Sequence, residues 1–326
     1  MEKFIDNKFT SSRKCIHRIK YGSGSLMQIK FTNHPLHSDE FFFDKNEITT
    51  WPQVDVFLKI TSELSPVLDN FPKALSYSAC DTNVCYLEDL GNICLEDLKV
   101  SSFLHKDQVV NLSYQIPTFI TNLQLCIGKA FSTLNSRVLG PASLKAEIQE
   151  FKNNLPSDVQ MSDLFQNEVW DFFTKTLLEL ICNQKLLPCH RDFRPANLLL
   201  KGNLIKVVDY QDACLGSYTY DLASFLNEID LPKYLQDLFI TNFFNLLPST
   251  NKPSFLEFKK DLYVSQIQRG LKILARRQRL SKEKVFSPSN KKIILNVIKL
   301  LKKVNLPYYS HLMKKSLSTY YNLDLA

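Results

Sequence analysis

No apolar run in this chain approaches the roughly 20 residues of a membrane-spanning helix, so we expect no membrane span. The first residues, MEKFIDNKFTSS, lack the apolar core of a secretory signal peptide, which favours a cytoplasmic protein. The eight cysteines are scattered, with no Cys-x-x-Cys pair and no histidine cluster beside them. This pattern predicts reduced thiols and no structural zinc.

Internal repeats and low-complexity tracts are also missing, and the composition is that of a globular protein. Hydrophobic residues make up 44% of the 326 residues, and the length suits one bilobal unit or two modest domains. The net charge is +7, a balance that can indicate nucleic acid or a membrane surface as partner. The lysines and arginines are spread along the chain, however, and a solvated surface explains most of them. We therefore expect no nucleic-acid partner. We also expect the protein to be either a monomer or a dimer.

The most informative stretch is 188–226, PCHRDFRPANLLLKGNLIKVVDYQDACLGSYTYDLASFL. Its pattern predicts a loop, a strand, a tight turn and a second strand that ends at Asp209. In that arrangement Asp192, Asn197 and Asp209 meet at one end of a hairpin. Phosphoryl transfer requires a carboxylate to orient the attacking hydroxyl, together with an amide and a second carboxylate to hold Mg²⁺.

The segment from His190 to Asn197 matches the kinase catalytic loop H-R-D-x-x-x-x-N at every defined position. Any one of these residues alone would more often cap a turn. Their order around a hairpin favours catalysis, with Asp192 as the catalytic carboxylate and with Asn197 and Asp209 as Mg²⁺ ligands. His190 is expected to support the loop structurally. ATP and Mg²⁺ are the expected cofactors.

The same stretch differs from protein kinases and resembles another family. Asp-Tyr-Gln stands at 209–211 where protein kinases have Asp-Phe-Gly, and no Ala-Pro-Glu occurs in the chain. The stretch resembles the aminoglycoside phosphotransferase/choline kinase superfamily of small-molecule kinases. Within that superfamily, VVDYQDACLGSYTYDLASFL is most similar to bacterial kinases that phosphorylate the anomeric hydroxyl of N-acetylmuramate and N-acetylglucosamine in cell-wall recycling. Those kinases carry an Asp-Phe-Gln-Asp-Ala core followed by Tyr-Asp-Leu.

This resemblance implies an α+β, protein-kinase-like fold with two lobes. Residues 1–91 would form a small antiparallel-sheet N-lobe with the nucleotide-binding strands and the hinge. Residues 92–326 would form a larger, mostly helical C-lobe with the catalytic loop, the metal site and the acceptor pocket. Asp221 would hold the catalytic loop through backbone N–H groups. Apolar spacing also predicts scaffold helices over 108–125, 164–180, 261–280 and 291–303.

The N-lobe contains two strand candidates, 13–21 and 25–31, joined by a Gly-Ser-Gly turn. In a kinase-like lobe, 10–13 would be the loop over the ATP phosphates. This loop has no glycine, but the Ser12 hydroxyl and the Arg13 guanidinium could contact phosphate.

Lys30 ends the segment 26–30, which is similar to the Val-Ala-Ile-Lys strand whose lysine contacts the ATP phosphates. An exposed strand lysine is an equal alternative. Glu63, on an expected helix at 54–64, is the candidate partner of Lys30. The segment 88–90 is the expected hinge, where backbone groups of Glu88 and Leu90 would bind adenine. A turn after an edge strand is the alternative.

The acceptor pocket has three candidate residues, Gln211, Asp212 and Arg269. Arg269 lies in a Gln-Arg-Gly-Leu-Lys segment similar to the Gln-Arg-x-Leu-Lys helix of the anomeric kinases. Asp212 could lie near the sugar, or equally could be a carboxylate at a helix N-terminus.

Two other functions stay open at this point. A glycine-free phosphate loop would suit a non-catalytic kinase-like binding module, although the intact Asp192, Asn197 and Asp209 argue against it. The acceptor could instead be an aminoglycoside or a choline-type molecule. The basic balance of the chain favours a neutral or anionic sugar over such a cation.

Overall fold

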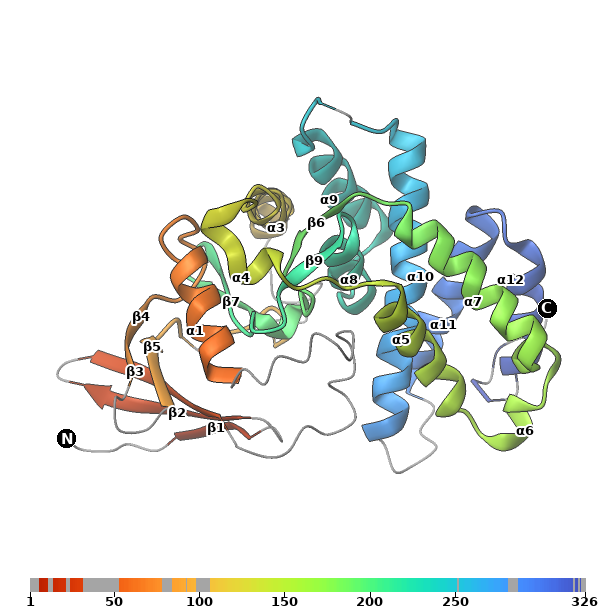
Figure 1. The fold of residues 1–326 in the computed structure, drawn as a ribbon, viewed down its shortest axis with the longest axis horizontal. Helices are drawn as coiled ribbons and strands as arrows, with labels where there is room; N and C mark the ends of the chain where they lie inside the picture. Colours follow the sequence, from red (N-terminus) through yellow and green to blue (C-terminus); the bar gives the residue numbers. More distant parts are fainter. Residues whose placement is uncertain are drawn as a thin grey trace. The chain divides into compact units, whose positions relative to one another are not determined.

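The computed structural model describes residues 6–10, 14–21, 24–31, 53–77, 84–91, 93–97, 106–250, 252–280, 287–318, 320, 321 and 323. The chain divides into two compact units, which we describe separately (Figure 1). The first unit comprises Met1–Val138, Leu187–Leu215 and Ile229–Leu246. The second comprises Leu139–Leu186, Gly216–Glu228 and Leu247–Ala326. The two lobes expected from the sequence, 1–91 and 92–326, stay a prediction.

The first unit contains a five-stranded antiparallel sheet in the order β1-β2-β3-β5-β4. The strands expected at 13–21 and 25–31 are confirmed as β2 and β3, which pair along their whole length. Helix α1 contacts β4 and β5, and its apolar residues Phe57, Ile60 and Leu64 recur on one face and are buried. The elements are β1 (Asp6–Thr10), β2 (Lys14–Tyr21), β3 (Gly24–Phe31), α1 (Gln53–Leu64), β4 (Ala74–Tyr77) and β5 (Val84–Glu88).

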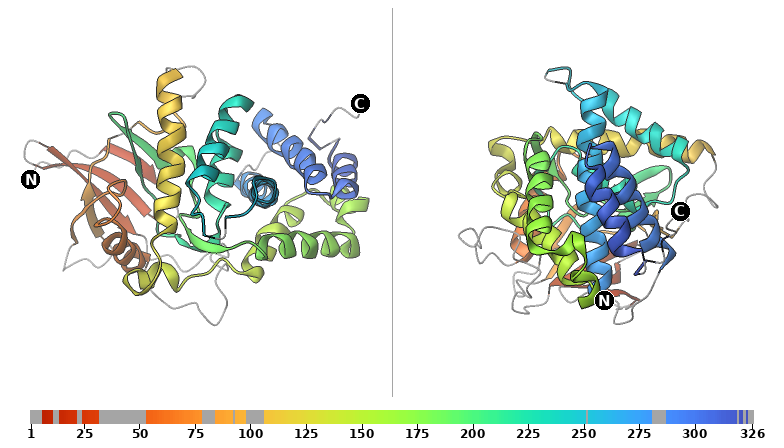
Figure 2. Two further views of the ribbon diagram at one scale, coloured as in Figure 1. Left: turned by 90° about the horizontal axis from the view of Figure 1, so that it is seen from above. Right: turned by 90° about the vertical axis from the view of Figure 1, so that its right-hand side faces the viewer.

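A helical part and a β-hairpin complete the first unit. Helices α3 and α9 pack side by side (Figure 2), and α3 also contacts β8 of the hairpin. The Asn242 amide joins α9 to α3 by donating to the Ser113 carbonyl oxygen at 2.9 Å. The elements are α3 (Lys106–Gln124), η2 (Lys129–Phe131), α4 (Ser132–Asn135), η4 (Pro195–Asn197), β7 (Leu198–Lys201), β8 (Leu204–Val207) and α9 (Lys233–Leu246).

The second unit is helical and is built around α10, which contacts α5, α7, α8 and α11. The predicted amphipathic segment 291–303 forms part of α11, whose apolar face is buried and packs against α10 and α12 (Figure 2). The helices are α5 (Pro141–Asn153), α6 (Ser157–Gln160), η3 (Asp163–Phe165), α7 (Asn167–Cys182), α8 (Tyr220–Glu228), α10 (Phe255–Leu280), α11 (Pro288–Lys303) and α12 (Pro307–Leu317). Two short strands, β6 (Leu186–Cys189) and β9 (Cys214–Ser217), form a separate two-stranded sheet.

These elements confirm the predicted α+β class, because a small antiparallel sheet near the N-terminus is followed by a mostly helical remainder. The helices expected over 108–125, 164–180 and 261–280 correspond to α3, α7 and α10. Across the described ranges, no helix combines the length and the apolar character needed to cross a membrane.

Gly270 lies where α10 packs closely against α11, and it gives a first prediction. A Cβ atom at Gly270 would lie 2.7 Å from Cγ2 of Val297. Alanine improves helix propensity by about 1 kcal/mol, but overpacking a core costs ~1–3 kcal/mol. We therefore expect Gly270→Ala to lower the free energy of unfolding by about 1 kcal/mol in urea denaturation. Val297→Ala removes the obstructing methyl group, so the double variant should lose less than the sum of the single losses. Strict additivity would contradict this steric account.

Candidate functional site

The loop from His190 to Asn197 directly follows β6 and is fixed by buried aromatic rings. Phe193 is fully buried and stacks on Phe119 of α3, with ring centroids 5.4 Å apart. The His190 ring, also fully buried, meets the edge of Phe193, and its Nε2 lies 3.0 Å from the Val208 carbonyl oxygen. These contacts fix the position of the ring, and the structural role expected for His190 stays a prediction.

Asp192 and Asn197 are in direct contact. The Asn197 Nδ2 donates to the backbone oxygen of Asp192 at 2.8 Å and to its Oδ2 at 2.9 Å. The Arg194 Nε lies 3.5 Å from the same carboxylate oxygen. Because the Asn197 Nδ2 is engaged with Asp192, its Oδ1 is the atom through which Asn197 could bind a cation.

The predicted hairpin is confirmed and brings Asn197 and Asp209 to one end. Strands β7 and β8 pair antiparallel with Leu198 opposite Val207, and Gly202 takes a left-handed φ of 63° in the turn. The amide of Val208 donates to the Asn197 carbonyl oxygen at 3.1 Å. Asn197 precedes the first strand and Asp209 follows the second, so both stand at the open end of the hairpin.

Asp209 is held in an uncommon backbone conformation. Its φ is 67°, and Arg191 in the catalytic loop has φ 69°; of the other non-glycine residues in the described ranges, Asn305 alone has a positive φ. The Gln211 Nε2 donates to Asp209 Oδ1 at 2.9 Å. The Gln211 Oε1 is buried and, among the described residues, has no hydrogen-bond partner. Gln211, predicted to face the acceptor, thus contacts the predicted metal carboxylate.

Tyr210 anchors this segment in the core of the first unit. Its fully buried ring stacks on Phe57 at 4.9 Å and meets Phe71 edge-on at 4.7 Å. The phenol oxygen lies 2.8 Å from Thr61 Oγ1 of α1, and burial raises the pKa of Tyr210. We did not predict this anchor. The aromatic residue in the Asp-Tyr-Gln motif was the sequence signal that could have indicated it.

Arg137 also contacts this segment, and nothing in the sequence pattern predicted it. It follows α4, and its NH1 donates to the backbone oxygens of Gln211 at 2.5 Å and of Ala213 at 3.3 Å. Burial lowers the pKa of Arg137, whereas the nearby charge of Asp212 raises it. Arg137 lies between the predicted scaffold helices at 108–125 and 164–180, where a lone arginine carries little signal.

The predicted hinge lies beside the hairpin. Glu88 ends β5 and forms an ion pair with Lys201 at 2.8 Å, and Leu90 is buried. Past the hinge, the Leu95 amide donates to the Leu198 carbonyl oxygen at 2.9 Å, so the chain continues along β7. Residues 88–90 therefore join β5 to the segment that runs along β7, and both the hinge and adenine binding there stay predictions.

Asp89, between those two residues, is a polar anchor that the sequence did not predict. Its carboxylate accepts from Arg18 Nε at 2.5 Å and from Arg18 NH2 at 2.9 Å, and from the Ser25 hydroxyl at 2.5 Å. Burial alone would raise the pKa of Asp89, but these hydrogen bonds lower it overall. The contacts tie the hinge to β2 and β3.

The expected pairing of Lys30 with Glu63 is wrong. Lys30 is exposed on β3, opposite Val84. The Glu63 carboxylate instead accepts from the amides of Thr133 at 2.8 Å and Leu134 at 3.2 Å. The first amides of a helix lack intrahelical partners, so a carboxylate at the start of α4 satisfies them. Ser12 and Arg13, the other predicted phosphate contacts, lie outside the described residues.

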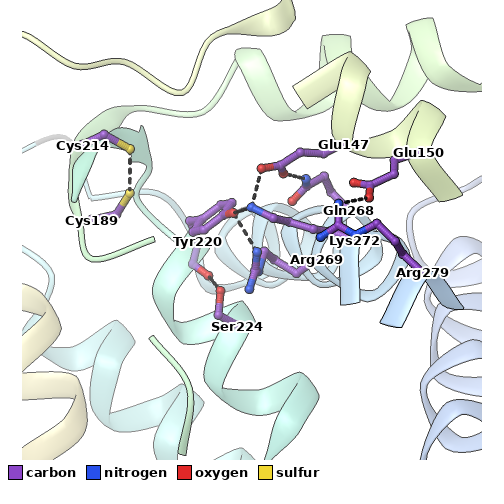
Figure 3. A network of polar contacts seen from close by, with 10 residues as sticks. All are labelled: Glu147, Glu150, Cys189, Cys214, Tyr220, Ser224, Gln268, Arg269, Lys272 and Arg279. Atoms are coloured by element: carbon purple, nitrogen blue, oxygen red, sulfur yellow. Dashed lines mark hydrogen bonds and ion pairs between the residues drawn. The ribbon is translucent and has the colours of Figure 1, made fainter. Parts of the chain in front are cut away.

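The second unit contains Arg269 in a buried polar network on α10 (Figure 3). Arg269 is 3% exposed, and its NH1 donates to the Tyr220 hydroxyl at 2.9 Å while the guanidinium lies over the Tyr220 ring. Gln268 and Lys272 both donate to Glu147, which is fully buried on α5. The sequence analysis named Arg269 but not Tyr220 and Glu147, which contact this part of α10, and a place for Arg269 in the acceptor pocket stays a prediction.

Two further predicted residues stay without a tested role. Asp221 is buried in the first turn of α8 in the second unit, and its support of the catalytic loop stays a prediction. Asp212 is close enough to Arg137 for its charge to raise the arginine pKa. That charge contact lies in the first unit, and a role of Asp212 beside the sugar also stays a prediction.

The donor set at the hairpin fits Mg²⁺. In the described part of the chain, no group of three or more His, Cys, Asp or Glu side chains could hold a metal ion. Mg²⁺ needs no such cage, because it binds through one or two protein oxygens together with phosphates and water. Asn197 and Asp209 supply such oxygens, and the buried, unpartnered Oε1 of Gln211 lies on the residue that contacts Asp209. The thiols of Cys189 and Cys214, also drawn in Figure 3, are not joined in a disulfide, and their sulfur atoms lie 3.8 Å apart.

Part of the chain matches a known protein family and a known kinase. Residues 97–249 match the model of the phosphotransferase enzyme family. Over 63 residues the chain is 38% identical to an N-acetylmuramate/N-acetylglucosamine kinase of Neisseria meningitidis serogroup B, and this match spans 19% of each protein.

Solved structures resemble the chain over nearly its whole length. A variant of aminoglycoside 2'-phosphotransferase-IIIa in complex with GDP has a TM-score of 0.59 at 13% identity, covering 94% of this chain and 93% of that chain. An ethanolamine kinase of Plasmodium vivax has a TM-score of 0.57 at 13% identity, covering 94% and 84%. The predicted kinase-like fold is therefore confirmed, and so is the resemblance of this chain to the aminoglycoside phosphotransferase/choline kinase superfamily, with 97–249 matching the phosphotransferase enzyme family.

Proposed function

We propose that this protein is an ATP- and Mg²⁺-dependent kinase that phosphorylates a small hydroxylated molecule, and that its acceptor is the anomeric hydroxyl of N-acetylmuramate or N-acetylglucosamine. The observation that carries the proposal is the contact of Asn197 with Asp192 at the open end of the hairpin that leads to Asp209. Phosphoryl transfer needs these groups together, because its catalysis consists of positioning and charge neutralisation.

Each residue has a distinct role in this proposal. Asp192 accepts a hydrogen bond from the acceptor hydroxyl and takes its proton as the phosphoryl group is transferred. Asn197 and Asp209 would hold Mg²⁺, which when bound neutralises charge on the β- and γ-phosphates. The hinge at 88–90 would bind adenine through backbone groups, and Lys30, Ser12 and Arg13 would contact the phosphates.

The acceptor class is supported by acidity, by charge and by the similar kinase. An anomeric hydroxyl is more acidic than an ordinary alcohol, so one carboxylate such as Asp192 can take its proton. The N. meningitidis kinase that resembles part of this chain is named for both sugars. Arg269 on α10 is the side chain proposed for the lactyl carboxylate of N-acetylmuramate, a group that a cationic aminoglycoside or choline does not offer to a guanidinium.

A panel of acceptors tests the proposal directly. The protein is incubated with ATP, Mg²⁺ and either N-acetylmuramate, N-acetylglucosamine, an aminoglycoside or choline, and the products are followed by ³¹P NMR. An anomeric phosphate on either sugar is expected, and its chemical shift separates it from a primary phosphate ester. Activity on a cationic acceptor alone would refute the amino-sugar assignment and leave the kinase assignment standing. No transfer to any acceptor, with Mg²⁺·ATP still bound, would favour the binding module.

Arg269 gives a prediction for sugar selectivity. Arg269→Lys keeps the charge but loses the two parallel hydrogen bonds with which a guanidinium grips a carboxylate. Because N-acetylglucosamine lacks the lactyl carboxylate, we expect KM for N-acetylmuramate to rise about tenfold more than KM for N-acetylglucosamine, or ~1.4 kcal/mol. Arg276→Lys, an exposed position on the same helix, is the matched control and should change neither KM. Equal increases for both sugars would remove Arg269 from the pocket.

A further inference from the structure

The segment 209–213 is held by more contacts than the proposed chemistry explains. The Tyr210 side chain is anchored in α1, and the Ala213 amide donates to the Tyr210 carbonyl oxygen at 3.0 Å, which closes a turn. Arg137 NH1 donates to the backbone oxygens of Gln211 and Ala213, so it spans the end of that turn. The Gln211 side chain then reaches back to Asp209. A continuous path of hydrogen bonds therefore runs from Arg137 through Gln211 to the Asp209 carboxylate.

The backbone at Arg137 is itself fixed to the strand that follows this turn. Its carbonyl oxygen accepts from the Leu215 amide at 2.8 Å, and Val138 forms a parallel bridge with Leu215. Just before Arg137, the Glu63 carboxylate holds the first amides of α4. The guanidinium is therefore presented from a support that is anchored on both sides.

Asp209 needs such support because its conformation is unfavourable by itself. A left-handed φ at a non-glycine residue costs ~1–3 kcal/mol and persists only where the surroundings impose it. A Mg²⁺ ligand must also keep its carboxylate oriented, and partners of metal ligands provide that orientation. Gln211 has both kinds of contact, since its side chain donates to Asp209 and its backbone oxygen accepts from Arg137.

The charges around Arg137 are consistent with this structural use of a cation. Burial and the neighbouring charge of Arg191 lower the pKa of Arg137, and Asp212 raises it. An arginine stays protonated under such conditions, whereas a lysine titrates readily when buried. The donor that holds the turn is therefore always charged.

We propose that Arg137 is a positioning residue for the Mg²⁺-binding carboxylate of Asp209 and that it acts through Gln211. The proposal rests on the proposed kinase function and adds a residue outside the catalytic motif. Arg137 would touch neither nucleotide nor acceptor; it fixes the turn that orients the metal ligand.

The test compares nucleotide binding with and without metal. Arg137→Met keeps the aliphatic stem and removes the guanidinium, whose NH1 makes both hydrogen bonds, and Arg137→Lys keeps a cation without the guanidinium. Calorimetry of ADP binding should show that Arg137→Met weakens Mg²⁺·ADP about tenfold but metal-free ADP less than twofold. The Mg²⁺ concentration for half-maximal kcat should rise, excess Mg²⁺ should restore part of kcat, and Arg137→Lys should lie between. Arg276→Met, at an exposed arginine, is the matched control and should leave all values unchanged.

Several outcomes would overturn the proposal. Equal weakening of ADP binding with and without Mg²⁺, at an unchanged Tm, would show that Arg137 does not act on the metal ligand. If Arg137→Met fails to fold, Gln211→Leu decides, because it removes the next link and must give the same metal-selective loss. A wild type that binds ADP equally with and without Mg²⁺ would overturn the proposed function as well. If the variants keep the wild-type preference for Mg²⁺·ADP over metal-free ADP, the inference about Arg137 fails and the proposed function stands.

Discussion

Asp192→Asn should abolish turnover while ATP still binds. The substitution keeps the size of the side chain and removes the carboxylate that takes the acceptor proton. Positioned acid–base groups contribute ~10²–10⁴-fold, so kcat should fall by at least that factor. The local structure should survive, because an amide oxygen can still accept the hydrogen bond that Asn197 now gives to the Asp192 carboxylate. Initial rates of sugar phosphate formation and calorimetry with Mg²⁺·ATP measure the two effects.

The control for this variant is Asp158→Asn, which makes the same chemical change at an exposed position of α6. It should leave kcat and ATP binding as they are. A near-wild-type kcat for Asp192→Asn would show that the catalytic loop is wrongly assigned. A loss of ATP affinity as large as the loss of kcat would indicate that the variant disturbs the loop rather than the proton transfer.

The parts of the site that the sequence predicted correctly are local in the chain. The hairpin with Asn197 and Asp209 at its open end depends on two short apolar runs and one glycine turn, all within thirteen residues, a span that periodicity and turn chemistry describe. The same reasoning located β2 and β3. The contact between Asp192 and Asn197 follows from motif spacing, since the two residues are five positions apart.

The parts that the sequence did not predict are long-range contacts. Arg137 and Gln211 are 74 positions apart, and Glu147 and Lys272 are 125 apart, so no local pattern joins them. The Lys30–Glu63 pair was expected by analogy, but the nearby start of α4 offers unsatisfied amides to the glutamate. Tertiary packing decided these partners.

Asp209→Asn should weaken Mg²⁺·ATP far more than metal-free ATP. A carboxylate is a hard, charged oxygen ligand for Mg²⁺, and a neutral amide is a poorer one. Loss of a residue that hydrogen-bonds to a metal ligand already costs about 10–100-fold in metal affinity, so loss of a direct ligand should cost ~10²-fold or more. Asparagine also tolerates the left-handed φ of 67° found at this position.

Asp209→Ala provides the comparison that separates metal binding from backbone strain. Alanine loses the ligand and also resists a positive φ, so its Tm should fall, whereas that of Asp209→Asn should stay near the wild-type value. An asparagine oxygen can still accept the hydrogen bond from Gln211, which keeps the turn in place. Calorimetry of ATP binding with and without Mg²⁺ then measures the loss of Mg²⁺ binding separately from any effect on the backbone. Equal weakening of both forms of ATP would mean that Asp209 is not a Mg²⁺ ligand.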